Sequence, residues 1–289
     1  MMSDVEKIPC SVLVLTRNSA ATLGRCLQNL SLFGEVLVHD GNSEDGSVAI
    51  AKEYGAKVLP QYPGDPVASV RVKDFTEIRL RQRADARCDW VLYLDADEYM
   101  SDALVKEVGE ILRTAAPKTI VKFRRYPVID GRPRTRGMYA PEIVPRIHHR
   151  LSGATLKGGK LVHEKYVYDS SFQQIVAKSP LYVPLENVAA LRVKDDRYLT
   201  LEVEKIRANG YPWSRYVRWV LLREPLVLLS LLLRILANTP WYFRPEGVPF
   251  DHEWRYVCYH WRLFRAITGA MLAHPLAAGR VRSAATHTK

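Results

Sequence analysis

The sequence predicts an α/β fold with a mostly parallel sheet, an antiparallel extension and a helical C-terminal region. In the first hundred residues, apolar runs of strand length alternate with segments of helical periodicity, and this alternation is typical of a parallel sheet with crossover helices. From residue 118 to about residue 185 the runs become β-like, with loops rich in proline and glycine between them. From Asp195 onward the periodicity is helical. We therefore expect an α/β domain over residues 1–190, a helical region over 191–278 and a disordered tail over 279–289.

The first strand is the apolar run Ser11–Leu15, and a helix with Leu23, Leu27 and Leu30 on one face follows it. The alternation continues through strand 35–39, helix 48–54, strand 57–59, helix 74–87 and strand 90–94. Ser101 is a suitable N-cap for the next helix. Ligands of parallel sheets bind in the crevice outside the carboxyl ends of the strands. Polar residues that follow these strands are therefore the candidates for a functional site.

The antiparallel extension and the C-terminal helices follow in the same way. The β-like runs are 119–123, 142–148 and 161–168, and the helical segments are 195–206, 217–237 and 251–272. We expect the pair His148 and His149 to lie on an exposed strand. Four widely spaced cysteines without a Cys-x-x-Cys pair argue against a zinc knuckle or a disulfide framework and fit a reducing compartment.

The charge is divided unevenly along the chain. Residues 1–100 hold 11 Lys and Arg against 15 Asp and Glu, whereas residues 101–289 hold 31 against 16. A basic half can serve nucleic acid, an anionic membrane surface or a phosphate-bearing ligand. No known nucleic-acid-binding motif accompanies the charge, so nucleic acid is not the expected partner.

Two carboxylates stand at the end of the strand Trp90–Leu94. Asp95 and Asp97 lie two residues apart where the strand gives way to a turn, so both can face one hard cation. Mg²⁺ prefers such oxygen ligands and takes the rest of its shell from water and substrate phosphates. The alternative is that the pair only forms a cap or a turn. Glu98, the next acidic residue, is expected to have a structural role, as a cap or as a group that orients its neighbours.

Polar residues also follow the first two strands. Thr16, Arg17 and Asn18 come after the first, where they can line a nucleotide pocket or form an ordinary loop. Asp40 ends the second strand and could accept hydrogen bonds from a base or a ribose. The alternative for Asp40 is an Asx-turn with the following Gly41 and Asn42.

The extension supplies two further candidates. His163 and Glu164 lie in a β-like run, where alternation sends their side chains to opposite faces. Glu164 could act as a general base for an acceptor hydroxyl, and His163 as a metal or phosphate ligand; an exposed surface pair is the alternative. Arginines crowd this region, and arginine suits phosphate recognition.

The C-terminal helical region combines aromatic residues with arginines, for example Trp213, Trp219, Arg215 and Arg218. Helices of this composition can lie in a membrane interface. A buried helix or a homodimer contact explains the pattern equally well. No apolar run reaches the ~20 residues that span a bilayer, and the first ten residues have no signal-peptide core. We expect a cytoplasmic protein, peripheral on the inner face of the cytoplasmic membrane.

Three stretches of the chain resemble the family-2 glycosyltransferases of GT-A fold, and within them bacterial enzymes of lipopolysaccharide-core synthesis. They are residues 11–18 (SVLVLTRN), 35–46 (EVLVHDGNSEDG) and 89–98 (DWVLYLDADE), and their order and spacing match. The resemblance covers about residues 8–110 and extends more loosely to Arg146 and the run Val162-His163-Glu164. It implies an inverting transfer of a hexose from a nucleotide-sugar to a saccharide or lipid-linked saccharide of the cell envelope. The donor it implies first is a UDP-hexose.

The resemblance also implies roles for single residues. Thr16, Arg17 and Asp40 would contact the nucleotide, and Asp95 and Asp97 would form the DxD motif. Mg²⁺ or Mn²⁺ would be the cofactor, with Asp97 as its principal contact.

Three more residues take roles in the same scheme. Asn18 and Arg146 would join the nucleotide-sugar site, and His163 the metal. Family members often place the base in a Glu-Asp motif that this chain lacks in its usual setting, and Glu164 is the expected substitute.

Two alternatives to this function stay open on the sequence. A nucleotidyltransferase on a similar sheet would use paired carboxylates and Mg²⁺ but release pyrophosphate. A basic protein that binds a membrane or nucleic acid without catalysis would use the acidic cluster only for structure.

Overall fold

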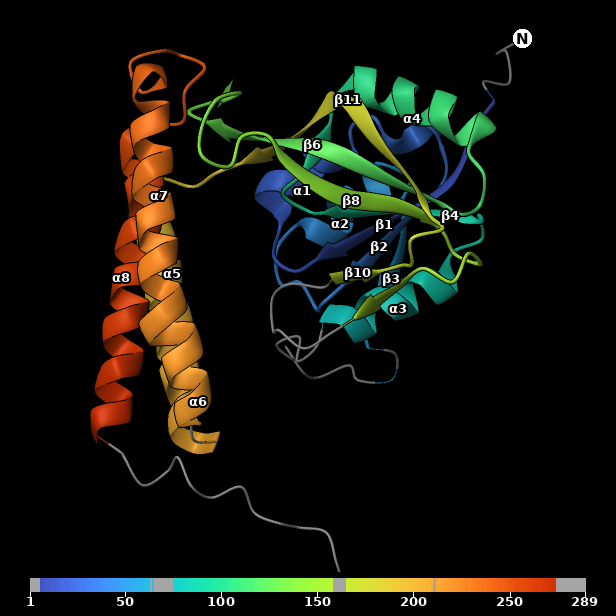
Figure 1. Cartoon of the computed structure of the whole chain (residues 1–289). Helices are drawn as coiled ribbons and strands as arrows, with labels where there is room; N and C mark the ends of the chain where they lie inside the picture. Colours follow the sequence, from blue (N-terminus) through green and yellow to red (C-terminus); the bar gives the residue numbers. More distant parts are fainter. Residues whose placement is uncertain (1–5, 63, 65–74, 158–164, 210–211, 274–289) are drawn as a thin grey trace, which may run out of the picture. The chain divides into compact units, whose positions relative to one another are not determined.

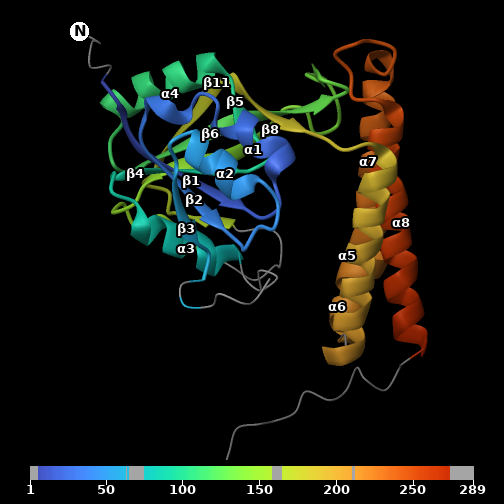
Figure 2. The same cartoon turned by 180° about the vertical axis from the view of Figure 1, so that it is seen from behind.

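The computed structural model describes residues 6–62, 64, 75–157, 165–209 and 212–273 (Figures 1 and 2). The chain divides into two compact units. The first takes in the chain up to Pro133 and the segment Pro141–Pro184, and the second is the loop Arg134–Ala140 with the chain from Leu185 onward. The predicted α/β architecture with antiparallel parts and C-terminal helices is confirmed. The tail 279–289, predicted to be disordered, lies outside the described residues.

The first unit is built on a nine-stranded sheet of order β3-β2-β1-β4-β8-β6-β11-β5, with β7 on β6, and a separate pair of β10 and β9. The strands are β1 (Ile8–Thr16), β2 (Phe33–Asp40), β3 (Lys57–Pro60), β4 (Trp90–Asp95), β5 (Tyr99–Met100), β6 (Thr119–Ile129), β7 (Arg132–Pro133), β8 (Glu142–His149), β9 (Thr155–Lys157), β10 (Lys165–Val167) and β11 (Gln173–Pro184). β3, β2, β1 and β4 run parallel. β8 is antiparallel to both β4 and β6, and β11 is parallel to β6. Most strands therefore run in one direction, with β8 reversed in the middle.

Helices cover both faces of this sheet (Figure 1). They are α1 (Ala20–Leu27), η1 (Leu30–Leu32), α2 (Ser47–Glu53), α3 (Phe75–Asp85) and α4 (Asp102–Thr114). Val12 and Val14 of β1 pack into the core shared with α1, α2 and α4, whereas Leu13 between them packs into a second core on the opposite face. Because alternate residues of β1 are buried on opposite faces, the strand is an unbroken apolar run in the sequence. The predicted N-cap is confirmed, since Ser101 Oγ accepts the Leu104 N–H at 3.1 Å.

His148 is buried, so the prediction that it lies on an exposed strand is wrong. It stands on β8, in register with Val91 of β4 and Ile120 of β6, and a strand between two neighbours in a covered sheet has no exposed edge. Its ring lies 5.7 Å from that of Tyr93 and 5.5 Å from that of Tyr166. Neither ring nitrogen has a hydrogen-bond partner among the described residues. Burial, together with the charges of Arg83 and His149, lowers the pKa of His148 to about 3.

This low pKa predicts an acid-sensitive fold. The neutral ring contributes its full stability above the unfolded pKa of ~6.5, and the contribution is lost as the pH falls toward the folded pKa. At pH 5 we expect the loss to reach about 2 kcal/mol. His148→Phe should remove this part of the pH dependence, which urea unfolding of both proteins at pH 7.5 and pH 5 measures. An equal loss of stability in both proteins would show that His148 is not its source.

The second unit consists mainly of helices: α5 (Val188–Asn209), α6 (Trp213–Tyr216), the π-helical segment η2 (Val217–Arg223), α7 (Glu224–Asn238), η3 (Thr239–Trp241) and α8 (Phe250–Ala273). α8 packs against both α5 and α7. Polar contacts join these helices: an ion pair with Arg255 Nη1 at 2.6 Å from Asp195, and a hydrogen bond with His260 Nδ1 at 2.8 Å from Glu224. None of the helices in the described part of the chain has the length and apolarity that crossing a membrane requires.

The loop Arg134–Ala140 packs with these helices, although it connects β7 to β8. The buried carboxylate of Glu253 accepts the Met138 N–H and the hydroxyl proton of Tyr242. The Val248 N–H donates to the Arg136 carbonyl at 2.8 Å. A side chain at Gly137 would come within 2.6 Å of the Glu253 carboxylate, so this close approach requires glycine.

Candidate active site

The ends of three neighbouring strands bring the predicted residues together. Thr16 of β1 is in register with Asp40 of β2, and Leu15 of β1 is in register with Asp95 of β4. The carboxyl ends of these parallel strands therefore form one edge, as expected for the crevice of such a sheet. Arg17 and Asn18 follow Thr16 directly, and both are exposed.

The loops after β1 and β2 hold each other in place. Asn18, in the left-handed region at φ 50°, donates its N–H to Ser43 Oγ at 2.9 Å and accepts the Glu44 N–H at 2.8 Å. Asp40 accepts the Ser43 N–H at 2.9 Å, so this carboxylate closes a turn of the kind expected from the sequence. Thr16 differs, because its buried Oγ1 has no hydrogen-bond partner among the described residues.

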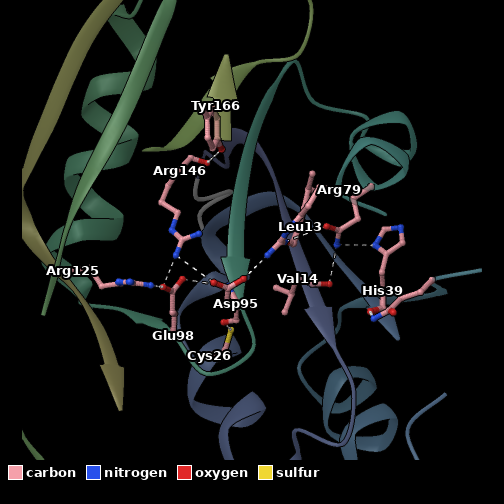
Figure 3. Close-up of polar contacts among 12 residues, drawn as sticks. Leu13, Val14, Cys26, His39, Arg79, Asp95, Glu98, Arg125, Arg146 and Tyr166 are labelled. Carbon is pink, nitrogen blue, oxygen red and sulfur yellow. Dashed lines mark hydrogen bonds and ion pairs between the residues drawn. The ribbon is translucent and has the colours of Figure 1, made fainter. Parts of the chain in front are cut away.

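Asp95 is clamped between two arginines (Figure 3). Arg79 contacts Oδ1, and Arg146 Nη2 lies 3.4 Å from Oδ2. The Asp95 side chain remains 42% exposed. Burial raises the pKa of Asp95, but the guanidinium groups of Arg146, Arg79 and Arg125 outweigh this and hold the pKa below its usual value. Asp95 is thus a positioned anion at the edge of the sheet.

Glu98 follows Asp95 in the chain and contacts two arginines of the cluster, Arg146 and Arg125. Its side chain is fully buried and contacts Arg146 as well as Arg125, whose Nη1 lies at 3.1 Å. The Glu98 carboxylate also accepts the Asp95 N–H at 3.3 Å. Burial raises the pKa of Glu98; Arg146 opposes this shift, and Asp95 adds to it. Glu98 therefore orients the cluster from inside the protein, in agreement with the role expected for it.

Asp97 is exposed, in contrast to its neighbours, and its carboxylate suits a hard cation. No group of three or more His, Cys, Asp or Glu in the described ranges is arranged to hold a metal ion. His163 and Glu164 lie outside the described residues. The Tyr166 hydroxyl donates to the Arg146 carbonyl at 3.3 Å.

Arg79 and Arg125 were not predicted as site residues. Arg79 belongs to a buried polar stripe on α3, formed with Thr76 and Gln82 at a spacing of three. Its Nη1 donates to the Leu13 carbonyl and to Gln82 Oε1, each at 3.2 Å. Gln82 in turn donates to the Val14 carbonyl at 3.0 Å. A polar stripe at helical spacing beside an apolar sheet is the signal that could have revealed Arg79; Arg125 on β6 gives no comparable signal.

The sequence profile of the Glycosyl transferase family 2 matches residues 11–166, more than half of the chain. The chain belongs to this family, so the resemblance drawn from the three stretches is confirmed. Membership in this family favours the predicted glycosyltransferase over the nucleotidyltransferase and the non-enzymatic alternatives.

Two individual relatives are glycosyltransferases by name. The lipopolysaccharide core biosynthesis glycosyltransferase LpsC of Rhizobium meliloti is 26% identical over 217 residues, which cover 71% of this chain and 74% of LpsC. An uncharacterized glycosyltransferase of Rickettsia felis is 32% identical over 144 residues, 47% of this chain and 45% of that protein. The chain thus spans less than half the length of the Rickettsia protein.

Two solved structures show partial similarity. Glucosyl-3-phosphoglycerate synthase from Mycobacterium tuberculosis, in complex with Mn²⁺, UDP and glucosyl-3-phosphoglycerate, is 25% identical with a TM-score of 0.34, over 40% of this chain and 43% of that one. Mannosyl-3-phosphoglycerate synthase from Rubrobacter xylanophilus is 19% identical with a TM-score of 0.41, over 70% of this chain and 75% of that one.

Proposed function

We propose that the protein is an inverting, metal-dependent glycosyltransferase that moves a hexose from a nucleotide-sugar to a saccharide or lipid-linked saccharide of the cell envelope. The donor we propose is a UDP-hexose. The observation that carries this proposal is the exposed carboxylate of Asp97 next to the arginine-clamped Asp95, at the strand ends that also hold Thr16 and Asp40. The similarity to LpsC supports an acceptor in lipopolysaccharide synthesis.

We assign the nucleotide-sugar to the crevice at these strand ends. The buried Thr16 hydroxyl has no hydrogen-bond partner among the described residues, and the exposed Arg17 and Asn18 follow it directly. Asp40 gives part of its hydrogen-bonding capacity to Ser43, but a carboxylate has further lone pairs for a base or ribose. Arg146 would act mainly by fixing Asp95.

The metal is assigned principally to Asp97. Both oxygens of Asp95 already contact guanidinium groups, so Asp95 joins the metal only if Arg146, the contact at 3.4 Å, moves away. Mg²⁺ or Mn²⁺ bound there would neutralise the charge that develops on the leaving diphosphate. His163 stays a predicted ligand.

The reaction we propose is a single displacement. The acceptor hydroxyl attacks the anomeric carbon from the face opposite the diphosphate, so a new C–O bond forms as the bond to the phosphate oxygen breaks and the configuration inverts. A carboxylate must take the hydroxyl proton. Glu164 stays the predicted base.

A donor screen tests this proposal. UDP-, GDP- and dTDP-hexoses are incubated with the protein and Mn²⁺, Mg²⁺ or EDTA, and products are identified by mass spectrometry. We expect metal-dependent release of UDP from a UDP-hexose, and thermal protection by donor plus metal that corresponds to about 2.7 kcal/mol at a hundredfold excess over Kd. Equal release in EDTA, or pyrophosphate release from a nucleoside triphosphate, would contradict it.

A further inference from the structure

Five leucines form an exposed row on the second unit, and we call them the leucine face: Leu222, Leu226, Leu229, Leu233 and Leu236. Each is more than half exposed. Their spacing alternates between four and three residues, which is the spacing of one side of a helix, here the segment η2–α7. Five aligned and exposed leucines are more than the scattered surface apolar residues of an ordinary soluble protein.

The leucine face is not needed to pack its own unit. Val220, Leu231 and Ile235 are buried and belong to the clusters that join this segment to α8. The segment is therefore apolar on two sides. One side contributes to the core of the unit, and the other faces outward.

Within residues 213–244 the charges on exposed side chains are all positive. Residues 213–244 contain five arginines and a single acid, Glu224. Glu224 is buried and its carboxylate contacts His260 at 2.8 Å, so it presents no charge on the outer side. Arg215 and Arg218 are exposed just before the leucines, beside the half-exposed Trp213 and Trp219.

This combination favours a lipid surface over a second copy of the chain. Leucines at alternating spacings of three and four could also form a coiled coil, but the flanking positions of a coiled coil need charges of opposite sign. Two copies joined along this face would bring the arginines of residues 213–244 together without an exposed acid of the same segment to pair with them. An anionic bilayer offers the missing negative charge, and tryptophan suits its headgroup region. The row from Leu222 to Leu236 is ~21 Å long, shorter than the ~30 Å hydrocarbon core, so it fits lying in the surface.

We propose that the leucine face binds the surface of an anionic lipid bilayer, with the leucines in the acyl region and Arg215 and Arg218 at the headgroup phosphates. The binding itself does not depend on the proposed enzymatic activity. Its use, which is to hold the enzyme where a lipid-linked acceptor lies, rests on the proposed function.

Vesicle co-sedimentation of the full-length protein tests the proposal. The vesicles contain phosphatidylcholine alone or mixed with phosphatidylglycerol. For Leu226→Gln/Leu229→Gln/Leu233→Gln we expect the partition coefficient on mixed vesicles to fall by about tenfold or more. For Arg215→Gln/Arg218→Gln we expect a loss of about fivefold per arginine, confined to the anionic vesicles.

A matched control replaces exposed apolar residues elsewhere in the same unit. Val193→Gln/Leu201→Gln on α5 should leave vesicle binding unchanged. Circular dichroism checks the fold of each variant, and single Leu226→Gln and Leu236→Gln variants serve if the triple variant does not fold.

Two outcomes would overturn the proposal. One is equal vesicle binding by the wild type and the folded leucine variants. The other is a wild-type dimer in light scattering that becomes a monomer in these variants, which would make the face a contact between copies. Hydrolysis of the nucleotide-sugar, measured without vesicles, tests the proposed function by itself. A failure of vesicle binding can therefore be told apart from a failure of the proposed function.

Discussion

Replacing Asp97 by Asn is expected to lower the metal-dependent turnover of the nucleotide-sugar by about 10²- to 10³-fold. The side chain keeps its size but loses the charge that would attract the cation. Asp97 is exposed, so the substitution should leave the fold intact. Initial rates over a range of Mn²⁺ concentrations, with a thermal unfolding curve, measure the two effects separately.

Asp130→Asn provides the control for Asp97→Asn. Asp130 is an exposed acid at a turn with φ 52°, a backbone conformation that Asn also adopts readily. This variant should keep wild-type turnover and stability. If Asp97→Asn kept them as well, the metal site would have to lie elsewhere and the proposed function would lose its main support.

Replacing Glu98 by Gln is expected to destabilise the protein by about 3 kcal/mol, because removing one partner of a buried ion pair leaves uncompensated charge in the interior. Glu98 is fully buried and contacts both Arg146 and Arg125. Without its charge, Arg146 would lose an anchor and Asp95 a fixed partner. Turnover should therefore fall together with stability.

Denaturant unfolding of wild type and Glu98→Gln measures this effect. Glu110→Gln is a suitable control, because Glu110 is an exposed glutamate on α4, and its change should stay within ~0.5 kcal/mol. An unchanged stability of Glu98→Gln would show that Glu98 is already protonated in the folded protein. The arginines would then be held by Asp95 and Glu142 alone.

For residues 1–95 the sequence was sufficient to predict the order of the elements and the edge at which Thr16, Asp40 and Asp95 meet, whereas the strand β11 was not among the predicted β-like runs. These residues directly follow apolar strands, and parallel strands end at a common edge, so local pattern was enough. The turn made by Asp40 was likewise foreseen as an alternative, since Asp followed by Gly and Asn is turn chemistry.

What escaped prediction depends on contacts between distant parts of the chain. Arg79 reaches Asp95 from the helix α3, and Arg125 reaches Glu98 from the strand β6. Neither the sequence separation of these residues nor the periodicity of the two elements indicates the contacts. The reversed β8 lies between β4 and β6, and that order buries His148. Hydrophobic periodicity reports which faces of a strand are apolar but not which strands lie beside it.

The loop Arg134–Ala140 has a consequence for how the protein can be divided. The polypeptide crosses between the two units after Pro133, after Ala140 and after Pro184, so neither unit is one continuous stretch of chain. A fragment cut at Pro184 would keep the loop but lose Glu253 and Val248, to which its backbone is bonded. Chimaeras that exchange the helices between family members must therefore exchange this seven-residue loop with them.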